Sequence, residues 1–147
     1  MKRFTLFVML IISSVSFAQL KKVDVVKPIL VGNSGAQSVE CTKLGNTYTI
    51  VYSDMNFPNI KTFKEFSFDD VDNTFEDLYK TIADGFENMP KEEVNLSLPN
   101  YLITLNYKKT LGIVSLYLES SRNGSGVTGS TYPLTKKQVD KLFGKKK

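Results

Sequence analysis

Apolar and polar residues alternate in short runs along the first half of this chain, and alternation of this kind predicts half-buried β-strands. Two such runs, residues 39–44 and 47–52, are separated by Gly45 and Asn46, a dipeptide that favours the tight turn of a β-hairpin. A third strand is predicted over residues 61–68. The side chains that share the apolar faces of the second and third strands are Tyr48, Ile50, Tyr52, Phe66 and Phe68.

The next segment changes to a spacing of three and four residues, which predicts the longest helix of the chain. The apolar positions on this helical face are Phe75, Leu78, Tyr79, Ile82 and Phe86. Asn73 and Glu76 have the spacing of a capping box, which predicts the start of the helix. Gly85 and Pro90 predict where it ends.

Alternation returns in the second half and predicts three more strands followed by a short helix. The strands are predicted over residues 94–98, 101–107 and 111–119. A tight turn is expected at residues 108–110, and a Gly/Ser-rich loop over residues 120–132. The helix is predicted over residues 135–143, where Thr135 and Gln138 have capping-box spacing.

The order of these elements is β-β-β-α-β-β-β-α, and it predicts an α+β fold. Connections between successive strands are short, whereas parallel strands need crossovers of about a dozen residues or more, so most pairings should be antiparallel. We therefore expect a two-layer domain in which a mostly antiparallel sheet of five to six strands packs against one long helix, with a short C-terminal helix.

The first eighteen residues have the pattern of a cleaved signal peptide. Lys2 and Arg3 precede an apolar run over residues 4–12, and Ser16-Phe17-Ala18 provides a small-x-small cleavage site. The apolar run is about half the length of the roughly 20 residues that a membrane-spanning helix needs. The pattern predicts a periplasmic or secreted protein without stable insertion in the membrane.

The remaining chain divides into an arm and one domain. Residues 19–37 mix Lys, Pro, Gly, Asn and Ser around two apolar pieces, which predicts an extended or flexible N-terminal arm or a short edge strand. Residues 38–147 are predicted to form a single α+β domain, because their number suits one hydrophobic core.

Composition removes several classes of site. The chain has no histidine, which excludes Ser-His-Asp triads, Cys-His pairs and histidine-ligated zinc. Its single cysteine, Cys41, lies far beyond the cleavage point, so it does not fit a lipid-attachment site, and it cannot form a disulfide within the chain. We expect Cys41 to be a small buried residue on a strand, although a bridge to another chain remains an alternative.

Two sequence patterns resemble ligand motifs and are rejected on their context. Residues 124–129 match G-x-G-x-x-G, but Pro133 intervenes before the helix and no strand follows it, so no nucleotide cofactor is predicted. An acidic cluster spans residues 69–77, but Phe75 stands where a calcium loop needs glycine, and Thr81 where it needs glutamate. The cluster is better explained by favourable charge at a helix start, and no metal is predicted.

Charge and loop composition suggest where contacts with a partner lie. Net charge is about −7 over residues 54–93 and about +7 over residues 94–147. The residues predicted as candidate contacts are Arg122, Asn123, Ser125, Thr128 and Tyr132 on the loop, and Lys136 and Lys137 in the basic C-terminal segment. A solvated connector and a solubilising tail are the alternatives. Nucleic acid is not expected as a partner, because the aromatic residues alternate within strands as core positions.

The pattern favours an exported, non-enzymatic binding or interaction module for an unknown protein or small ligand in the envelope or outside the cell. Two alternatives stay open. One is an inhibitor or immunity-type protein of a secreted enzyme, which predicts an exposed patch of aromatic residues and arginine. The other is a small carboxylate-dependent hydrolase, which predicts two acids together in a cleft.

Overall fold

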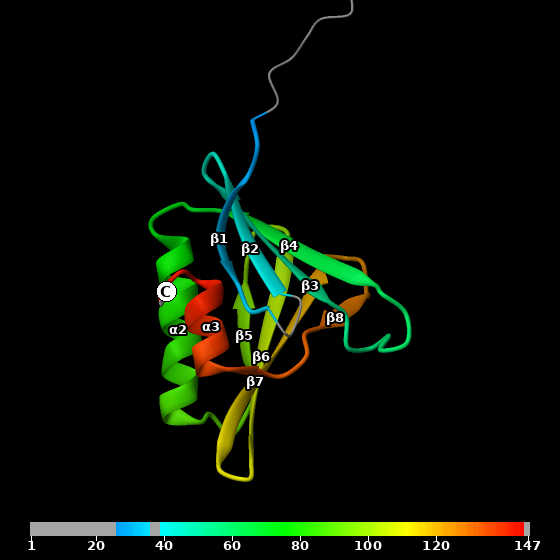
Figure 1. Ribbon diagram of the computed structural model, residues 1–147, viewed down its shortest axis with the longest axis vertical. Helices are drawn as coiled ribbons and strands as arrows, with labels where there is room; N and C mark the ends of the chain where they lie inside the picture. The colour runs from blue at the N-terminus through cyan, green and yellow to red at the C-terminus, as the bar shows by residue number, and fades with distance from the viewer. Residues whose placement is uncertain (1–25, 36–38, 146–147) are drawn as a thin grey trace, which may run out of the picture.

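The computed structural model describes residues 26–35 and 39–145, and it arranges them as two antiparallel sheets with two helices packed along one side (Figure 1). Within these residues, the first sheet has the order β1 (Ile29–Asn33), β2 (Val39–Leu44), β3 (Thr47–Ser53) and β4 (Phe63–Asp69). The second has β5 (Val94–Ser97), β6 (Tyr101–Thr110), β7 (Ile113–Arg122) and β8 (Thr128–Ser130), with β9 (Leu134–Thr135) also paired to β7. Helix α2 (Thr74–Asn88) connects the sheets, and α3 (Lys136–Leu142) follows β9.

The α+β class, the antiparallel pairing, the long helix and the short C-terminal helix are confirmed. The strands form two sheets of four and five strands, however, where one sheet of five to six was expected. A helix of 15 residues is about 22 Å long and about 10 Å wide, so it covers only a few strands spaced about 4.8 Å apart. Turning the apolar faces of two sheets toward each other buries the side chains that the helix cannot cover.

The two predicted hairpin turns have different outcomes. Gly45 and Asn46 connect β2 to β3 as expected, with Leu44 paired to Thr47. The turn predicted at residues 108–110 is wrong, because β6 continues to Thr110 and the turn lies at Leu111-Gly112. Both turn residues have positive φ, 51° and 83°, which is the backbone of the tight hairpin turns that match strand twist.

The two predicted helix starts also differ. Thr135 and Gln138 form the capping box of α3, with the Thr135 amide donating to the Gln138 side chain at 2.8 Å. The capping box predicted at Asn73 is wrong, because this residue has a left-handed backbone and its side chain makes no cap bond. Asp70 instead accepts from the Phe75 amide at 2.9 Å.

The predicted end of the long helix is corrected in the same way. Gly85 lies inside α2, which continues to Asn88, and only Pro90 marks the end. A side chain at Gly85 would overlap the ring of Tyr107, whose hydroxyl donates to the Ile82 carbonyl at 2.9 Å. Glycine is required here by close packing between α2 and β6.

Aromatic side chains connect both helices to the first sheet in one core. Tyr48 of β3 stacks on Phe75 of α2 with ring centres 3.9 Å apart, and Phe143, at the end of α3, lies 5.0 Å from Phe75. Cys41 of β2 is fully buried in the same core, as the sequence predicted, and it is a free thiol. Burial raises the pKa of the Cys41 thiol to about 12, so the group stays protonated and unreactive at neutral pH.

Part of the predicted N-terminal arm belongs to the first sheet. Ile29–Asn33 form β1, an outer strand paired with β2. Residues 19–25, 36 and 37 of the arm lie outside the described residues, as does the predicted signal peptide, residues 1–18. In the part of the chain that the structure covers, no helix combines the length and the apolar character needed to cross a bilayer.

Candidate functional site: a cleft at the β4 edge

A cleft of about 460 Å³ lies where the first half of β4 meets the second sheet. Residues 63–65 of β4 form one wall, and Tyr101 of β6 with Ser120 and Arg122 of β7 form the other. The wall is completed by the loop after β7 and by Gly129 of β8. The cleft therefore lies at the junction of the two sheets.

Three consecutive residues of β4 line this cleft, which places it along the edge of the strand. Successive side chains of a strand point to opposite faces, so neighbours in sequence border one cavity only at the strand edge. Lys64 shares the inner face with the buried Phe66, whereas Phe63 and Glu65 belong to the outer face. In the described residues β4 pairs with β3 alone, so this edge carries no neighbouring strand.

Hydrogen bonds at the two ends of the β3–β4 pair show which backbone groups face the edge. The Asp54 amide donates to the Thr62 carbonyl, and the Asp70 amide donates to the Asn46 carbonyl, each at 2.9 Å. Hydrogen-bonded pairs alternate along an antiparallel ladder, so the even-numbered residues of β4 exchange hydrogen bonds with β3. The backbone N–H and C=O groups of the odd-numbered residues from Phe63 onward consequently point to the free edge.

A buried pair of hydroxyl groups lies at the cleft, where Ser120 is part of the wall and Tyr52 is bonded behind it. Ser120 lies 2.6 Å from the Tyr52 hydroxyl, oxygen to oxygen, and both side chains are buried. Burial raises the pKa of Tyr52 to about 12, so its phenol is protonated at neutral pH. Gly129 packs directly on this pair, because a Cβ there would lie 2.7 Å from the Tyr52 hydroxyl.

Two basic residues lie at the cleft without an acidic partner. Among the described residues, neither Lys64 nor Arg122 takes part in an ion pair. The nearest acid in sequence, Glu65, belongs to the outer face of the sheet and is exposed. The inner side of the cleft therefore has a positive charge suited to an anionic group.

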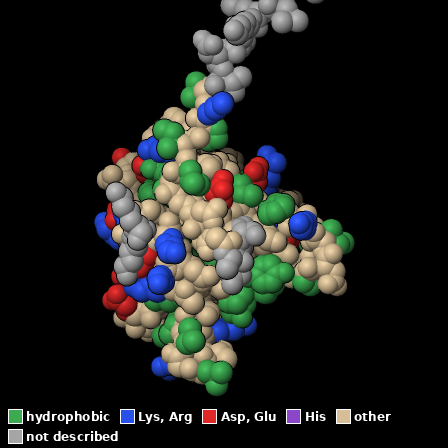
Figure 2. Space-filling view, in the orientation of Figure 1, with side chains coloured by type: hydrophobic (Ala, Val, Ile, Leu, Met, Phe, Trp, Pro, Cys, Tyr) green, Lys and Arg blue, Asp and Glu red, His purple; other side chains and the backbone are tan. Residues whose placement is uncertain are grey.

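Exposed apolar side chains at the cleft and on the neighbouring β3–β4 loop form an apolar rim. Phe63 and Val127, which line the cleft, are each 57% exposed. The β3–β4 loop adds the exposed side chains of Phe57 and Ile60. Figure 2 shows hydrophobic side chains gathered on the side of the molecule where this loop and β8 lie. Exposed apolar groups next to unpaired charges are typical of binding surfaces.

The apolar rim is held in place by one buried carboxylate. Asp54 Oδ1 accepts from the amides of Asn56 and Ser130, each at 3.1 Å. The Met55 amide also donates to the Ser130 carbonyl at 2.8 Å. These bonds fix the β3–β4 loop against β8, so the rim is a built part of the fold.

The structure separates the predicted contact residues into groups. Arg122 and Ser125 line the cleft. Asn123 lies on the same loop but binds the β5–β6 turn, where its side chain donates to the Pro99 carbonyl at 3.1 Å. Thr128 starts β8, and Tyr132 follows that strand without lining the cleft.

The two predicted lysines lie elsewhere. Lys136 and Lys137 belong to α3, which follows the pairing of Leu134 with Leu116 on β7. Arg122 is six residues further along β7, which corresponds to about 20 Å. Lys136 also pairs with the buried Asp140 at 3.3 Å. The predicted loop and tail contacts therefore do not form one surface.

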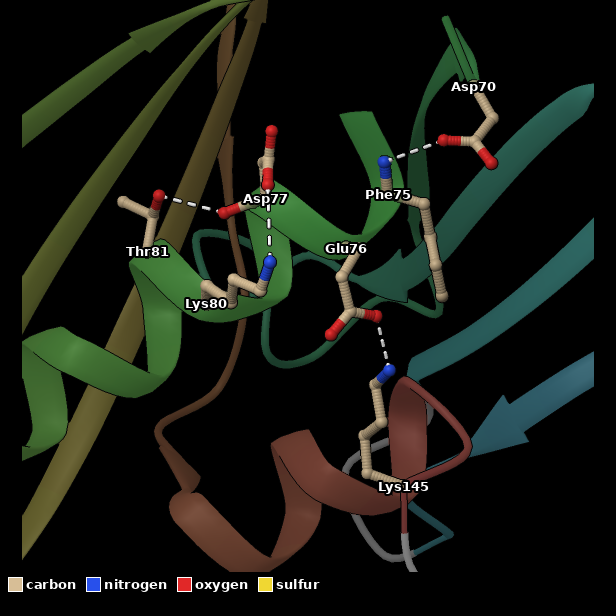
Figure 3. A network of polar contacts seen from close by, with 7 residues as sticks. All are labelled: Asp70, Phe75, Glu76, Asp77, Lys80, Thr81 and Lys145. Atoms are coloured by element: carbon tan, nitrogen blue, oxygen red, sulfur yellow. Dashed lines mark hydrogen bonds and ion pairs between the residues drawn. The ribbon is translucent and has the colours of Figure 1, made fainter. Parts of the chain in front are cut away.

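Three acids of the cluster at the start of α2 make structural contacts (Figure 3). Asp70 caps the Phe75 amide, Glu76 pairs with Lys145, and Asp77 lies 3.7 Å from Lys80. Within the described residues, no group of three acids or cysteines is placed to hold a metal ion. The arrangement agrees with the predicted role of these charges at a helix start.

A second depression contains the adjacent acids Glu92 and Glu93 beside the end of α2. Both side chains are exposed, and the Glu93 carboxylate already accepts from Asn106 at 2.8 Å. These exposed carboxylates at a surface depression do not form the pair of acids in a cleft that a hydrolase predicts.

Sequence reasoning missed most of the cleft, including Phe63, Lys64, Tyr101 and Val127. Three signals were present. Phe63 is a large apolar residue on the polar face of its strand, Lys64 is a charged residue on the inner face, and Val127 is an apolar residue in a polar loop. Tyr101 gave no such signal, because it continues the inner-face pattern of its strand.

The cleft brings basic, hydroxyl and apolar side chains together with the carboxylate of Glu65. Its cations, hydroxyls and apolar rim suit a ligand that carries an anionic group beside an apolar one. Comparisons with known protein families, curated proteins and solved structures give no match.

Proposed function

We propose that this protein is an exported, non-enzymatic binding module whose contact site is the cleft at the β4 edge. The observation that carries the proposal is the combination of unpaired Lys64 and Arg122 with an exposed apolar rim that the fold holds in place. The signal-peptide pattern of residues 1–18 supports a site of action in the periplasm or outside the cell.

Binding at the cleft is tested with a matched pair of small probes, benzoate and benzamide, which differ in charge. We expect benzoate, at millimolar concentration, to shift the amide NMR signals of residues 63–65 and 120–129, with smaller shifts from benzamide. Arg122→Glu should abolish the preference for benzoate, because it reverses the charge at the cleft. Lys137→Glu is the control, with the same charge change on α3.

Three results would contradict the cleft as the binding site. They are an absence of shifts with both probes, shifts that cluster on α3, or equal effects of the two substitutions. The export part is tested separately by fractionating the native host and sequencing the mature N-terminus. We expect the protein in an exported fraction, starting at Gln19. Native protein that retains Met1 and stays in the cytosol would overturn this part.

Among the alternatives, inhibition of a secreted enzyme gains support from the apolar rim formed by Phe57, Ile60, Phe63 and Val127. An inhibitor binds its target through an exposed apolar centre bordered by charge. A carboxylate-dependent hydrolase gains none, because the acids that lie together are exposed or already paired. In an inhibitor, the cleft and its rim would be the surface that contacts the target polypeptide.

A further inference from the structure

We propose that the cleft binds an extended segment of another polypeptide, which adds to the first sheet as a fifth strand along β4 and places a carboxylate beside Lys64 and Arg122. This inference rests on the proposed function of the cleft and specifies the kind of ligand. It depends on three features, which are the direction of the backbone groups of β4, the groove beside them and the charge at one end of it.

The backbone of β4 offers the hydrogen bonds that a strand needs. The N–H and C=O groups of Phe63, Glu65 and Ser67 point away from β3, as the ladder alternation requires. In the described residues no other strand pairs with them. An unpaired row of alternating donors and acceptors binds an extended peptide through its main chain.

The space beside β4 has the shape of a groove that follows the strand. The cleft of about 460 Å³ borders residues 63–65, and a smaller depression of about 90 Å³ borders residues 67–69 together with Thr47 of β3, Pro99 and Asn100. The seven residues of β4 span about 23 Å, so the two hollows lie in succession along this strand. An extended chain passes both, whereas a compact small molecule fills only the larger one.

The charges at the cleft favour a partner with a carboxylate over a second copy of this chain. In an antiparallel pairing of two β4 edges centred on Lys64, this residue would face its own copy, with Arg122 in the same hollow. Like charges that face each other across strands destabilise the pair. A carboxylate at this point gains charge-assisted hydrogen bonds from both cations.

The opposite edge of the sheet does not offer the same site. At β1, Gly32 lies so close to the Lys141 and Leu142 carbonyl groups of α3 that a single added methyl group would overlap them. The strand is also irregular, because its register shifts between Leu30 and Gly32. Packing against a helix and a bulge are two ways in which an outer strand is made unsuitable for further pairing.

The test uses a displayed library of unstructured twelve-residue peptides selected on the purified protein, followed by synthesis of the selected sequences. We expect the selected peptides to contain a run of alternating apolar residues with an Asp or Glu. Affinity is then measured by fluorescence anisotropy. Arg122→Glu should weaken binding by about 30-fold, since it replaces a charge-assisted bond by repulsion, and Lys137→Glu by less than about twofold.

A proline substitution separates strand addition from other modes of binding. The Glu65 amide points to the free edge, so Glu65→Pro removes one donor from the groove and leaves the ladder to β3 intact. We expect about tenfold weaker peptide binding, whereas Glu65→Ala, the control for loss of the side chain, changes affinity by less than about threefold. Circular dichroism confirms that both variants keep the fold.

Amide hydrogen exchange provides a direct readout of the new strand. On binding, the amides of Glu65 and Ser67 should become protected, whereas those of Lys64 and Phe66, which already donate to β3, should change little. Uniform protection, or protection confined to β1, would overturn strand addition. If benzoate shifts the cleft signals but the library yields no binders, strand addition fails and the cleft remains a small-ligand site. If neither probe binds, both proposals fail.

Discussion

The two outer strands of the first sheet, β1 and β4, have opposite surroundings. Gly32 of β1 packs against carbonyl groups of α3, with no space for a side chain. On β4, residues 63–65 border a cleft of about 460 Å³. At β1 the backbone of Gly32 packs against the backbone of α3, whereas β4 borders flexible side chains and open space.

This difference shows how one sheet can have a structural edge and a recognition edge. α3 is fixed to α2 by Tyr79, whose hydroxyl donates to the buried Asp140 at 3.0 Å, and by the Lys145–Glu76 ion pair. No comparable helix covers β4 in the described residues, and the cleft beside it is bordered by Tyr101 of β6, by the end of β7 and by β8. Where a helix returns to the sheet therefore determines which edge stays accessible.

The largest expected effect comes from adding one methyl group on the closed side. Gly32→Ala should lower the free energy of unfolding by at least about 3 kcal/mol, because the α3 backbone has to move. Gly129→Ala on the cleft side meets Lys64 Cγ and the Tyr52 hydroxyl at 2.7 Å, and side chains adjust more easily, so about 1 kcal/mol is expected. Urea unfolding followed by fluorescence measures both, and equal losses would contradict the comparison.

Alkaline pH should have the next largest effect, through two groups buried on the inner face of the first sheet. Burial raises the pKa of Cys41 and of Tyr52 to about 12, above their ordinary values of 9.0 and 10.0. The unfolded chain therefore releases these protons first, so stability is complete below about pH 9 and falls as the pH rises toward 12. We expect a loss of about 3 kcal/mol by pH 10.5.

Urea midpoints measured between pH 7 and pH 10.5 test this pH dependence. Cys41→Ala should give a shallower decline, because it removes one of the two groups, although the variant is less stable at every pH. A flat profile in the unmodified protein would show that these side chains contact water in the folded state.

A smaller effect is expected from loosening the contact that holds α3 in place. Tyr79→Phe removes the hydrogen bond to Asp140 and should cost about 1 kcal/mol. Tyr117→Phe is the matched control on the outer face of β7, and it should change stability by less than about 0.5 kcal/mol. Thermal unfolding distinguishes the two, and a loss at Tyr117 as large as at Tyr79 would remove the special role of the α3 contact.

The smallest effect on stability is expected at the cleft itself. Arg122 is exposed and forms no ion pair among the described residues, so Arg122→Glu should change the unfolding free energy by less than about 0.5 kcal/mol. The same substitution should strongly weaken ligand binding, which separates recognition from folding. A large loss of stability would show that Arg122 stabilises the end of β7 and that its role is structural.

Local sequence signals predicted structure well where the two interacting residues lie within one helical turn of each other. The Thr135–Gln138 capping box formed because its two residues bond to each other across three positions. The same spacing gave a wrong prediction at Asn73, because the Asp70 side chain caps the helix and Asn73 has a left-handed backbone. At Leu111 the turn shifted because Gly112 accepts a positive φ.

The cleft was predicted only in part, because its walls come from distant segments. Loop composition pointed to Arg122 and Ser125, which do line it. Phe63 and Lys64 precede α2, and Tyr101 follows it, so their meeting depends on how the second sheet docks on the first. No periodicity in the sequence encodes that docking.

The sequence alone determined six of the strands, the two helices and their buried faces, because the spacing of apolar residues follows the geometry of a single element. The loop predicted over residues 120–132 is wrong in part, because β7 continues to Arg122 and Thr128–Ser130 form β8. The tertiary structure decided that the strands divide into two sheets, that α3 closes the β1 side, and that β4 borders a cleft with Lys64 and Arg122. These outcomes depend on packing between segments far apart in the chain, where volume and backbone contact select one arrangement.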